Sequence, residues 1–485
     1  MEPYFLGIDI GTQGARVALM DVTGNLLGNN EVDFPLNKNS REEQSPLNWW
    51  EACMGSLQKL VKDIQGEVDV DKIISVAVTS TSGTVIPMDS SNEPIHNALM
   101  YSDQRAKNAA KICISAAKEH DNERYTSFGT SSGLAKILWF TEEFPDKAKK
   151  IDKWVHAADF ITGKLTGSWG ITDYTNAFKS GYDVLNYKWP AFLFDKLGLK
   201  PSWFPEVVAS GEVIGHLDNR VADILGLSPT INVTAGITDG CASQIASGAM
   251  KPGNWNTTIG TTMVIKGVTK EEIKDPLGRL YCHRHPSGFW MPGGASNTGA
   301  DWVTNEFSGE LSQLNKNAAT LIPSNLLAYP LRQQGERFPF VAENARGFEP
   351  EGRSKLERYV ANMEGVAYVE RYAYEMIEDL SGEPVNAVFT AGGGSNSDVW
   401  LRIRANVMDK PIYRMKHISG AVGAAILAAS RTHFDSITES ANAMTQIDTQ
   451  VNPTRDLIEA YDLTYQRFLK TLMEKGYIPK EKKYA

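Results

Sequence analysis

The chain has 485 residues, of which 42% are hydrophobic and 22% charged, and its formal net charge is −9. This length exceeds the range over which one hydrophobic core keeps growing, so we expect two domains. An acidic chain lacks the basic surface that phosphate-rich partners require, which argues against nucleic acid or an anionic membrane as the main partner. No apolar run reaches the roughly 20 residues that span a bilayer, and residues 1–7 lack a signal-peptide pattern, so we expect a cytoplasmic protein.

Two similar β-hairpins are predicted in distant parts of the chain. Residues 5–20 predict two strands joined by a tight turn at 11–14. Residues 256–266 predict a second hairpin. Both bends carry Ile-Gly-Thr, at 10–12 and at 259–261. This weak internal repeat suggests two related domains with a site between them.

The other predicted elements are helices and one buried strand. Apolar residues recur at helical spacing over 50–64, directly after a Ser-Pro pair. A second helix begins at a capping box formed by Ser354 and Glu357 and ends at Gly382. Residues 388–391 then predict a buried strand, and 398–408 a helix. Strands alternating with helices indicate a mixed α/β architecture.

The turn from Asp9 to Arg16 carries the groups that a magnesium–polyphosphate complex needs. Gly11 and Gly14 have no Cβ and allow close approach of the backbone, and Thr12 adds a hydroxyl. Asp9 ends a buried strand, where an unpaired charge is costly, so a cation is its simplest partner. The guanidinium of Arg16 suits phosphate. The alternative is an ordinary Gly-rich hairpin with an aspartate capping its turn.

A run of three glycines at 392–394 separates the predicted strand from the next helix. Such a loop admits a nucleotide or merely allows tight packing of strand on helix, and it lacks GxGxxG spacing. The second hairpin, with Gly260 and Thr261 at its bend, favours the nucleotide interpretation. Two Gly-Thr hairpins together with a Gly-rich loop are a more specific signal of a nucleotide site than a single Gly-Thr turn.

Asp239 is the candidate catalytic base. It follows the apolar stretch 231–234 and precedes Gly240, at the end of a predicted strand, where α/β enzymes place their chemistry. Phosphoryl transfer to an alcohol needs a carboxylate that orients the hydroxyl and accepts its proton. The alternative is that Asp239 only caps the helix that follows.

These motifs, in this order, resemble those of the FGGY family of carbohydrate kinases, within the actin/hexokinase/Hsp70 superfamily. The likeness runs from Gly7 to about Ala429. The similar segments are residues 7–12, 43–50, 101–105, 236–240, 391–395 and 420–425.

The resemblance implies a two-domain α/β protein with the actin-like ATPase (ribonuclease H-like) fold, in which mixed sheets flanked by helices border an interdomain cleft. It implies a sugar-binding domain over residues 1–240 and a nucleotide-binding domain over 241–485, with ATP and Mg²⁺ as cofactors. By the same likeness Asp239 is the base, and Asp9 supports magnesium directly or through water. The implied nucleotide contacts are Thr12, Gln13, Arg16, Gly260, Thr261, Gly299, Gly393, Gly394 and Ser397, and the implied sugar contacts are Thr81, Ser82 and Asp239.

Within the family, the stretches 81–85, 173–177, 181–183 and 293–299 look most like those of D-ribulose kinases. Typical xylulokinases carry Gln-Met-His-Gly where this chain has Thr-Ser-Gly-Thr, and glycerol kinases place Arg-Glu in that loop. The resemblance therefore implies phosphorylation of the terminal hydroxyl of a small ketose, with D-ribulose ahead of D-xylulose and of other ketoses or polyols.

Two functions of a different class stay open. A non-kinase actin-like ATPase would explain the hairpins but not the context of Asp239. A sugar-binding regulator would normally lose its carboxylates, whereas Asp9 and Asp239 are both present. We expect a small-molecule sugar as the partner, neither nucleic acid nor membrane, and a homodimer because that state is common among soluble enzymes.

Overall fold

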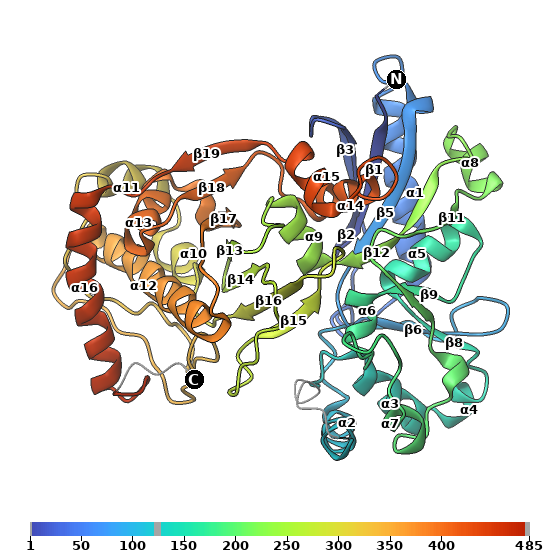
Figure 1. Cartoon of the computed structure of the whole chain (residues 1–485), viewed down its shortest axis with the longest axis horizontal. Coiled ribbons are helices and arrows are strands. Elements are labelled where there is room, and N and C mark those ends of the chain that lie inside the picture. The colour runs from blue at the N-terminus through green and yellow to red at the C-terminus, as the bar shows by residue number, and fades with distance from the viewer. Residues whose placement is uncertain (1, 121–127, 481–485) are drawn as a thin grey trace. The chain divides into compact units, whose positions relative to one another are not determined.

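The computed structural model describes residues 2–120 and 128–480. These fall into two compact units, drawn with their elements labelled in Figure 1. The first unit comprises Met1–Ala246, His283–Gly288 and His417–Thr445. The second comprises Ser247–Cys282, Phe289–Lys416 and Gln446–Ala485. The predicted assignment of sugar and nucleotide binding to residues 1–240 and 241–485 stays a prediction.

The first unit is built on a six-stranded sheet in the order β11-β12-β5-β1-β2-β3. β1, β5 and β12 are parallel, while β2, β3 and β11 are antiparallel to their neighbours. The hairpin predicted at the N-terminus is confirmed as β1 and β2. The strands are β1 (Tyr4–Ile10), β2 (Gly14–Asp21), β3 (Leu26–Asp33), β5 (Ile73–Ser80), β11 (Val213–His216) and β12 (Asn232–Thr238).

Helices cover both faces of this sheet because side chains alternate along each strand. In β1, Leu6, Ile8 and Ile10 enter a core that α1 (Pro46–Asp63) and α5 (Ala157–Thr166) share. Gly7 faces the other way, toward α14 (Gly420–Ala429). A Cβ added at Gly7 would lie 1.8 Å from the backbone oxygen of Ala421, so only glycine allows this helix to lie so close.

Smaller elements complete the first unit. A four-stranded sheet has the order β4-β7-β6-β8, and β9 pairs with β10. The strands are β4 (Glu43–Gln44), β6 (Val85–Met88), β7 (Ala98–Leu99), β8 (Lys153–His156), β9 (Ile171–Asp173) and β10 (Glu206–Val208). The helices are α2 (Lys107–Glu119), α3 (Gly133–Glu143), α4 (Pro145–Ala148), α6 (Tyr174–Phe178), α7 (Phe192–Asp195), α8 (Asn219–Leu225), α9 (Asp239–Ala246) and α15 (Ile437–Met444).

The second unit is built on a seven-stranded sheet in the order β15-β16-β14-β13-β17-β18-β19. Its strands are β13 (Asn254–Ile259), β14 (Met263–Gly267), β16 (Trp290–Ala295), β17 (Ala387–Ala391), β18 (Ile412–Met415), β19 (Ile447–Val451) and the first two residues of β15 (Tyr281–Arg284). Its helices are α10 (Asp301–Phe307), α11 (Leu311–Ala318), α12 (Lys355–Ser381), α13 (Asp398–Met408) and α16 (Arg455–Glu474).

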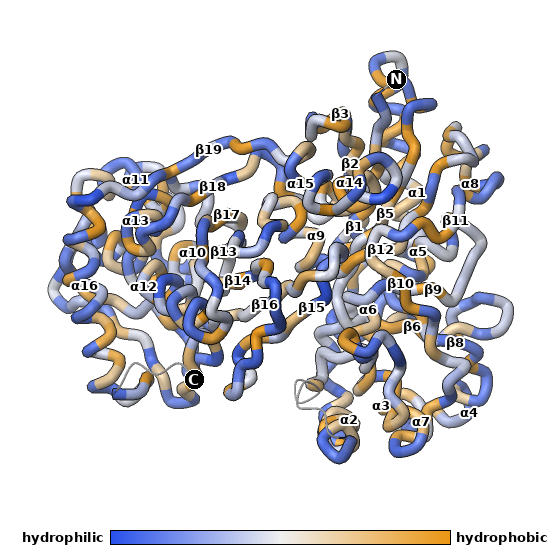
Figure 2. The backbone as a smooth tube through the Cα atoms, in the orientation of Figure 1, coloured by the Kyte–Doolittle hydropathy of each residue, from blue (hydrophilic) through white to orange (hydrophobic). Residues whose placement is uncertain are grey.

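The helix ends of the second unit follow local sequence signals. Ser354 and Glu357 form the predicted capping box of α12, and Gly382 ends that helix in the left-handed conformation. Along α16 hydrophilic and hydrophobic segments alternate in Figure 2, as expected for a helix with one buried face. The buried residues of α16 are Tyr461, Thr464, Tyr465, Phe468, Leu469 and Leu472.

The two units share one strand arrangement. In the first, the order is β11-β12-β5-β1-β2-β3. Its central strands β12, β5 and β1 are parallel, and each pairing outside them is antiparallel. In the second, β19-β18-β17-β13-β14-β16 repeats the same directions. The two predicted Ile-Gly-Thr bends lie at equivalent hairpins, β1–β2 and β13–β14. The weak repeat in sequence therefore reflects a duplicated architecture.

Among the described residues, no helix has both the length and the apolar character needed to cross a bilayer.

Candidate active site

Three parallel strands of the first unit end at the same edge of its sheet. Ile10 of β1 lies opposite Ser80 of β5, and Ser80 lies opposite Thr238 of β12. The carboxyl ends of parallel strands are where α/β enzymes bind their ligands. This register brings Asp9, the loop after Ser80 and Asp239 to one edge.

Asp9 is a buried carboxylate, with 7% of its surface exposed. Alternation along β1 puts it on the same face as Gly7, against the N-terminus of α14. A Cβ added at Gly420 would lie 2.7 Å from Asp9 Oδ2. Burial and the charge of Asp239 raise the pKa of Asp9 to about 6, and Arg16 opposes that rise.

The predicted phosphate contact Arg16 is engaged with carboxylates in this structure. Its Nη1 lies 3.6 Å from Asp9 Oδ2, and its Nη2 lies 2.7 Å from Glu31 Oε1. The turn beside it closes through a hydrogen bond from Gly11 N to Gly14 O at 3.0 Å. Thr12 and Gln13 are exposed at the tip of this turn.

Asp239 follows β12 directly and is the first residue of α9. Its Oδ1 accepts the backbone N–H of the next residue, Gly240, at 2.6 Å. The side chain is half-buried, and no described residue donates a hydrogen bond to its Oδ2. One carboxylate oxygen is thus fixed by the helix while the other stays available for a ligand.

The pair Asp9 and Asp239 suits a magnesium ion. Two carboxylates brought together in a partly buried site repel each other, and a divalent cation relieves that repulsion. Mg²⁺ binds hard oxygen ligands and commonly takes only one or two carboxylates, together with water and phosphate oxygens. Among the described residues there is no group of three or more His, Cys, Asp or Glu side chains that could form a closed metal cage.

The loop after β5 presents buried hydroxyls. Thr81 Oγ1 lies 2.8 Å from Thr84 Oγ1 and is engaged within the loop. Ser82 Oγ is buried and, in the described part of the chain, has no hydrogen-bond partner. The same holds for Ser80 Oγ and Thr238 Oγ1, which the sequence did not single out. A buried hydroxyl without a partner costs about 1–3 kcal/mol, so this cluster favours a polar ligand.

The second unit gathers its predicted residues at the ends of two parallel strands, β13 and β17. Ala300 N donates to Gly260 O at 2.8 Å, which ties the segment after Gly299 to the Gly260–Thr261 bend. A Cβ added at Gly299 would lie 2.5 Å from Thr261 O. The glycine loop joins the same cluster, because a Cβ at Gly392 would lie 2.5 Å from Ile259 O.

The glycine loop after β17 is open at its tip. Gly393 is exposed, and a Cβ added there would meet no atom within 4 Å, whereas Gly394 is buried against Ile259. Ser397, predicted to contact the nucleotide, caps α13 instead of lying free: its hydroxyl accepts from Trp400 N and donates to Asn315 Oδ1 at 2.6 Å. Its nucleotide contact stays a prediction.

A buried carboxylate that sequence reasoning missed organises this cluster. Glu336, 3% exposed, accepts hydrogen bonds from Ser296 Oγ at 2.9 Å, Asn297 N at 2.7 Å and Thr298 Oγ1 at 2.9 Å. These three residues lead directly into Gly299. Glu336 therefore holds the segment that packs on the Gly260–Thr261 bend. Its neighbours in sequence, Gly335 and Arg337, give no signal of such a role.

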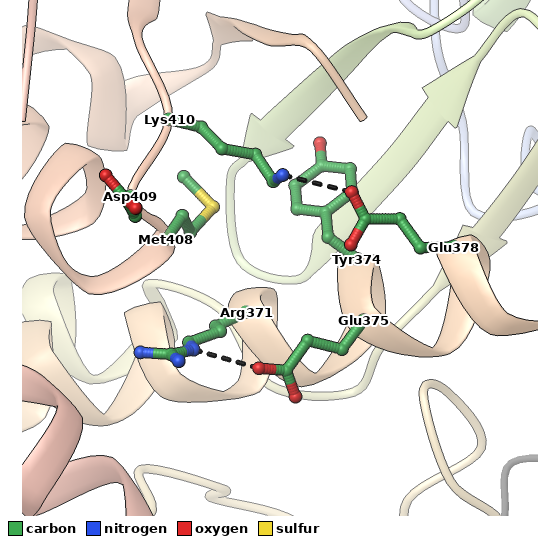
Figure 3. A pocket seen from close by; sticks show the side chains of 7 residues that line it. All are labelled: Arg371, Tyr374, Glu375, Glu378, Met408, Asp409 and Lys410. Carbon is green, nitrogen blue, oxygen red and sulfur yellow. Dashed lines mark hydrogen bonds and ion pairs between the residues drawn. The ribbon is translucent and has the colours of Figure 1, made fainter. Parts of the chain in front are cut away.

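A cavity of about 220 Å³ lies elsewhere in the second unit, between α12 and the end of α13 (Figure 3). Its charged side chains pair with one another: Arg371 Nε lies 3.0 Å from Glu375 Oε1, and Lys410 Nζ lies 3.0 Å from Glu378 Oε1. None of the predicted site residues lines it. The lining residues are Arg371, Tyr374, Glu375, Glu378, Met408, Asp409 and Lys410.

Comparison with known proteins identifies the class. Residues 4–246 match the N-terminal domain of the FGGY family of carbohydrate kinases, and residues 255–431 match its C-terminal domain. The two-domain fold is that of an ATP-dependent sugar kinase, a phosphotransferase acting on sugars. The chain belongs to the FGGY family of carbohydrate kinases.

Its relatives carry more than one activity in their names. The chain is 26% identical over 473 residues to a gluconokinase of Bacillus subtilis, covering 90% of each chain. It is 25% identical over 486 residues to a xylulose kinase of the same organism, covering 96% of each. The crystal structure of xylulose kinase from Rhodospirillum rubrum has a similar fold, with a TM-score of 0.84, 23% identity and coverage of 97% of this chain and 98% of that one.

Proposed function

We propose that this enzyme transfers the γ-phosphoryl group of MgATP to the terminal hydroxyl of a small ketose, with D-ribulose as the first candidate. The observation that carries the proposal is the shared sheet edge of the first unit. The strands that lead to Asp9 and Asp239 end at this edge, and the buried hydroxyls of Ser80, Ser82 and Thr238 belong to the ends of the same strands and the loop after β5.

Asp239 acts as the base in this proposal. Its free Oδ2 accepts the proton of the sugar hydroxyl and orients the oxygen in line with the γ-phosphorus. Asp9, with Asp239 nearby, would hold the Mg²⁺ ion, and the ion would offset the charge of the phosphates. Arg16 supports this arrangement by keeping Asp9 ionised.

The nucleotide is assigned to the second unit. The bend at Gly260 and Thr261 offers backbone N–H groups and a hydroxyl to the phosphates. The open tip at Gly393 admits the adenosine, since no atom lies within 4 Å of the position its Cβ would take. Gly394 borders the same loop.

The sugar is assigned to the hydroxyl cluster of the first unit. Ser82 is the stronger contact because its hydroxyl lacks a partner among the described residues, whereas that of Thr81 is engaged with Thr84. The loop has Ser82-Gly83 where typical xylulokinases carry Met-His, which favours D-ribulose over D-xylulose. Two alternatives have specific support: relatives named xylulose kinase and relatives named gluconokinase.

A coupled ADP-release assay tests the proposal across D-ribulose, D-xylulose, L-ribulose, gluconate, polyols and glycerol, each with Mg²⁺. The expected result is a kcat/KM for D-ribulose at least 10-fold above that of any other acceptor. A higher value for gluconate or D-xylulose would replace the substrate assignment. ATP hydrolysis that is independent of every acceptor would contradict the proposed transfer itself.

A cytoplasmic location and a homodimeric state stay predictions, to be checked by fractionation and by size-exclusion chromatography with light scattering.

A further inference from the structure

The strand that leads to Asp239 has an open edge just before that residue. β11 accompanies β12 as far as Thr234, and the amide of Ala235 donates to the backbone oxygen of Glu212 at 2.7 Å. Beyond Ala235, no described strand pairs with this side of β12. A buried backbone N–H in such a position needs an acceptor from another source.

The opposite side of the strand is irregular at the same level. The pairing of β12 with β5 shifts register between Thr234 and Ile237. Gly236 lies in this irregular stretch, where a Cβ would lie 2.3 Å from Val78 O. The pairing with β5 resumes at Ile237 and Thr238, so in the sheet the backbone before α9 is held from one side only, and Asp239 is the first residue of that helix.

A side chain supplies the missing acceptor. The buried amide of Thr238 donates to Thr175 Oγ1 at 2.9 Å. The hydroxyl of Thr175 has a single proton, which it donates to Asp173 Oδ2 at 2.7 Å. Because this proton is committed to the carboxylate, the lone pairs of the Thr175 oxygen are left for the amide of Thr238.

Asp173 is itself held in one orientation. It is fully buried, and its two oxygens accept from Thr175 N at 2.8 Å, Asn176 N at 3.2 Å, Asn176 Nδ2 at 2.6 Å and Ser210 Oγ at 2.6 Å. With the Thr175 hydroxyl these are five donors onto two oxygens, so both oxygens act as acceptors. Ser210 adjoins Gly211, whose amide donates to Ala235 O at 2.9 Å. Asp173 is thus linked to the edge of β12 at two points: through Thr175 to the amide of Thr238, and through Ser210 and Gly211 to the backbone oxygen of Ala235.

We propose that Thr175 and Asp173 are positioning residues for Asp239. They fix the backbone of Thr238, one residue before the base, and so set the direction of the Asp239 carboxylate. Neither side chain is assigned a contact with sugar or nucleotide. The inference rests on the proposed role of Asp239. A misplacement of about 1 Å in a reacting group can lower a rate about 100-fold, so this support has a measurable effect.

The test compares Thr175→Val, which removes the acceptor at nearly constant shape, with Thr175→Ser, which retains it. Thr172→Val is the matched control, because Thr172 is a buried threonine of β9, three residues before Thr175 of α6, and its hydroxyl donates to Asp159 Oδ1 instead. For each variant kcat, KM for sugar, KM for ATP and the melting temperature are measured. We expect Thr175→Val to lower kcat about 10- to 100-fold with both KM values within about threefold of wild type. Thr175→Ser restores kcat to within about threefold, and Thr172→Val lowers the melting temperature with kcat retained.

Three outcomes overturn the inference: an unchanged kcat in Thr175→Val, an equal loss in Thr172→Val, or no rescue by serine. If the valine variant does not fold, Thr175→Ala is measured instead, and an unchanged kcat in that variant has the same meaning. Asp239→Asn is assayed in parallel. An inactive Asp239→Asn with a fully active Thr175→Val overturns the positioning role alone, whereas an active Asp239→Asn overturns the assignment of the base.

Discussion

The carboxylate of Asp239 lies close enough to that of Asp9 for its charge to raise the pKa of Asp9. The two residues come from the ends of β1 and β12, strands that are separated in the sheet only by β5. Arg16, 3.6 Å from Asp9, compensates part of the repulsion. The site is therefore arranged to accept a cation together with a phosphate group.

Replacing Asp239 by asparagine is expected to lower kcat by about 10²- to 10⁴-fold, because the amide cannot accept the proton of the sugar hydroxyl. Binding of sugar and of nucleotide, measured by calorimetry, should stay within a few fold of wild type. Asp223→Asn changes an exposed carboxylate of α8 in the same unit and serves as the control. Near-normal turnover in Asp239→Asn would rule out this base.

Gly420→Ala is expected to displace Asp9. The new Cβ would lie 2.7 Å from Asp9 Oδ2 and 2.8 Å from its Cγ, which is closer than non-bonded atoms come. We expect kcat to fall about 10-fold or more and the Mg²⁺ concentration for half-maximal activity to rise. Gly55→Ala is the control, since its Cβ would make an ordinary contact of 3.7 Å with Val32. Unchanged Mg²⁺ dependence in Gly420→Ala would contradict the role given to Asp9.

Glu336→Gln is expected to weaken ATP binding. An amide offers one acceptor oxygen where the carboxylate offers two, so a buried donor among Ser296, Asn297 and Thr298 loses its partner at a cost of about 1–3 kcal/mol. The loop before Gly299 then shifts, and we expect KM for ATP to rise about 10-fold with KM for sugar unchanged. Glu343→Gln, on an exposed side chain nearby, is the control. Equal changes in both KM values would mean a general loss of structure.

Glu364 is expected to make the second unit less stable as the pH rises. This buried carboxyl accepts from Ser324 and Tyr461, yet burial raises its pKa from an ordinary 4.5 to about 7. Between these two values the folded state keeps a proton that the unfolded state has lost. The free energy of unfolding therefore falls as the pH rises from about 4.5 through about 7.

Glu364→Gln removes this titration and keeps a neutral side chain of the same shape. Urea unfolding of both proteins at pH 5 and pH 8 measures the difference. We expect the difference in free energy of unfolding between Glu364→Gln and wild type to shift in favour of the variant by about 1–3 kcal/mol from pH 5 to pH 8. The same difference between the proteins at both pH values would show that Glu364 does not titrate in this range.

Features that depend on neighbouring residues were predictable from the sequence. The hairpins, the capping box of Ser354 and Glu357 and the glycine that ends α12 all follow local rules of turn and cap chemistry. Asp9 and Asp239 were found because each ends a strand beside glycines. The register of β1, β5 and β12 then brings their ends to one edge, as the mixed α/β reading implies.

Features that depend on distant residues were not predictable. Thr175 and Thr238 are 63 positions apart, and nothing in either segment indicates that one hydroxyl meets the amide of the other. The same is true of Glu336 and Ser296, 40 positions apart. Two-residue strands such as β4 and β7 are too short to give a period. Such contacts arise from tertiary packing, and a pattern read along the chain does not contain them.

The place of α14 in the first unit has a consequence for how the protein is made. This helix lies on β1, yet it is synthesised only after the second unit's segments Ser247–Cys282 and Phe289–Lys416. A nascent chain that ends at residue 246 lacks the cover for that face of the sheet and would expose it to chaperones or to other nascent chains. The first unit therefore completes its folding late in translation, and expression of residues 1–246 alone would give an unstable fragment.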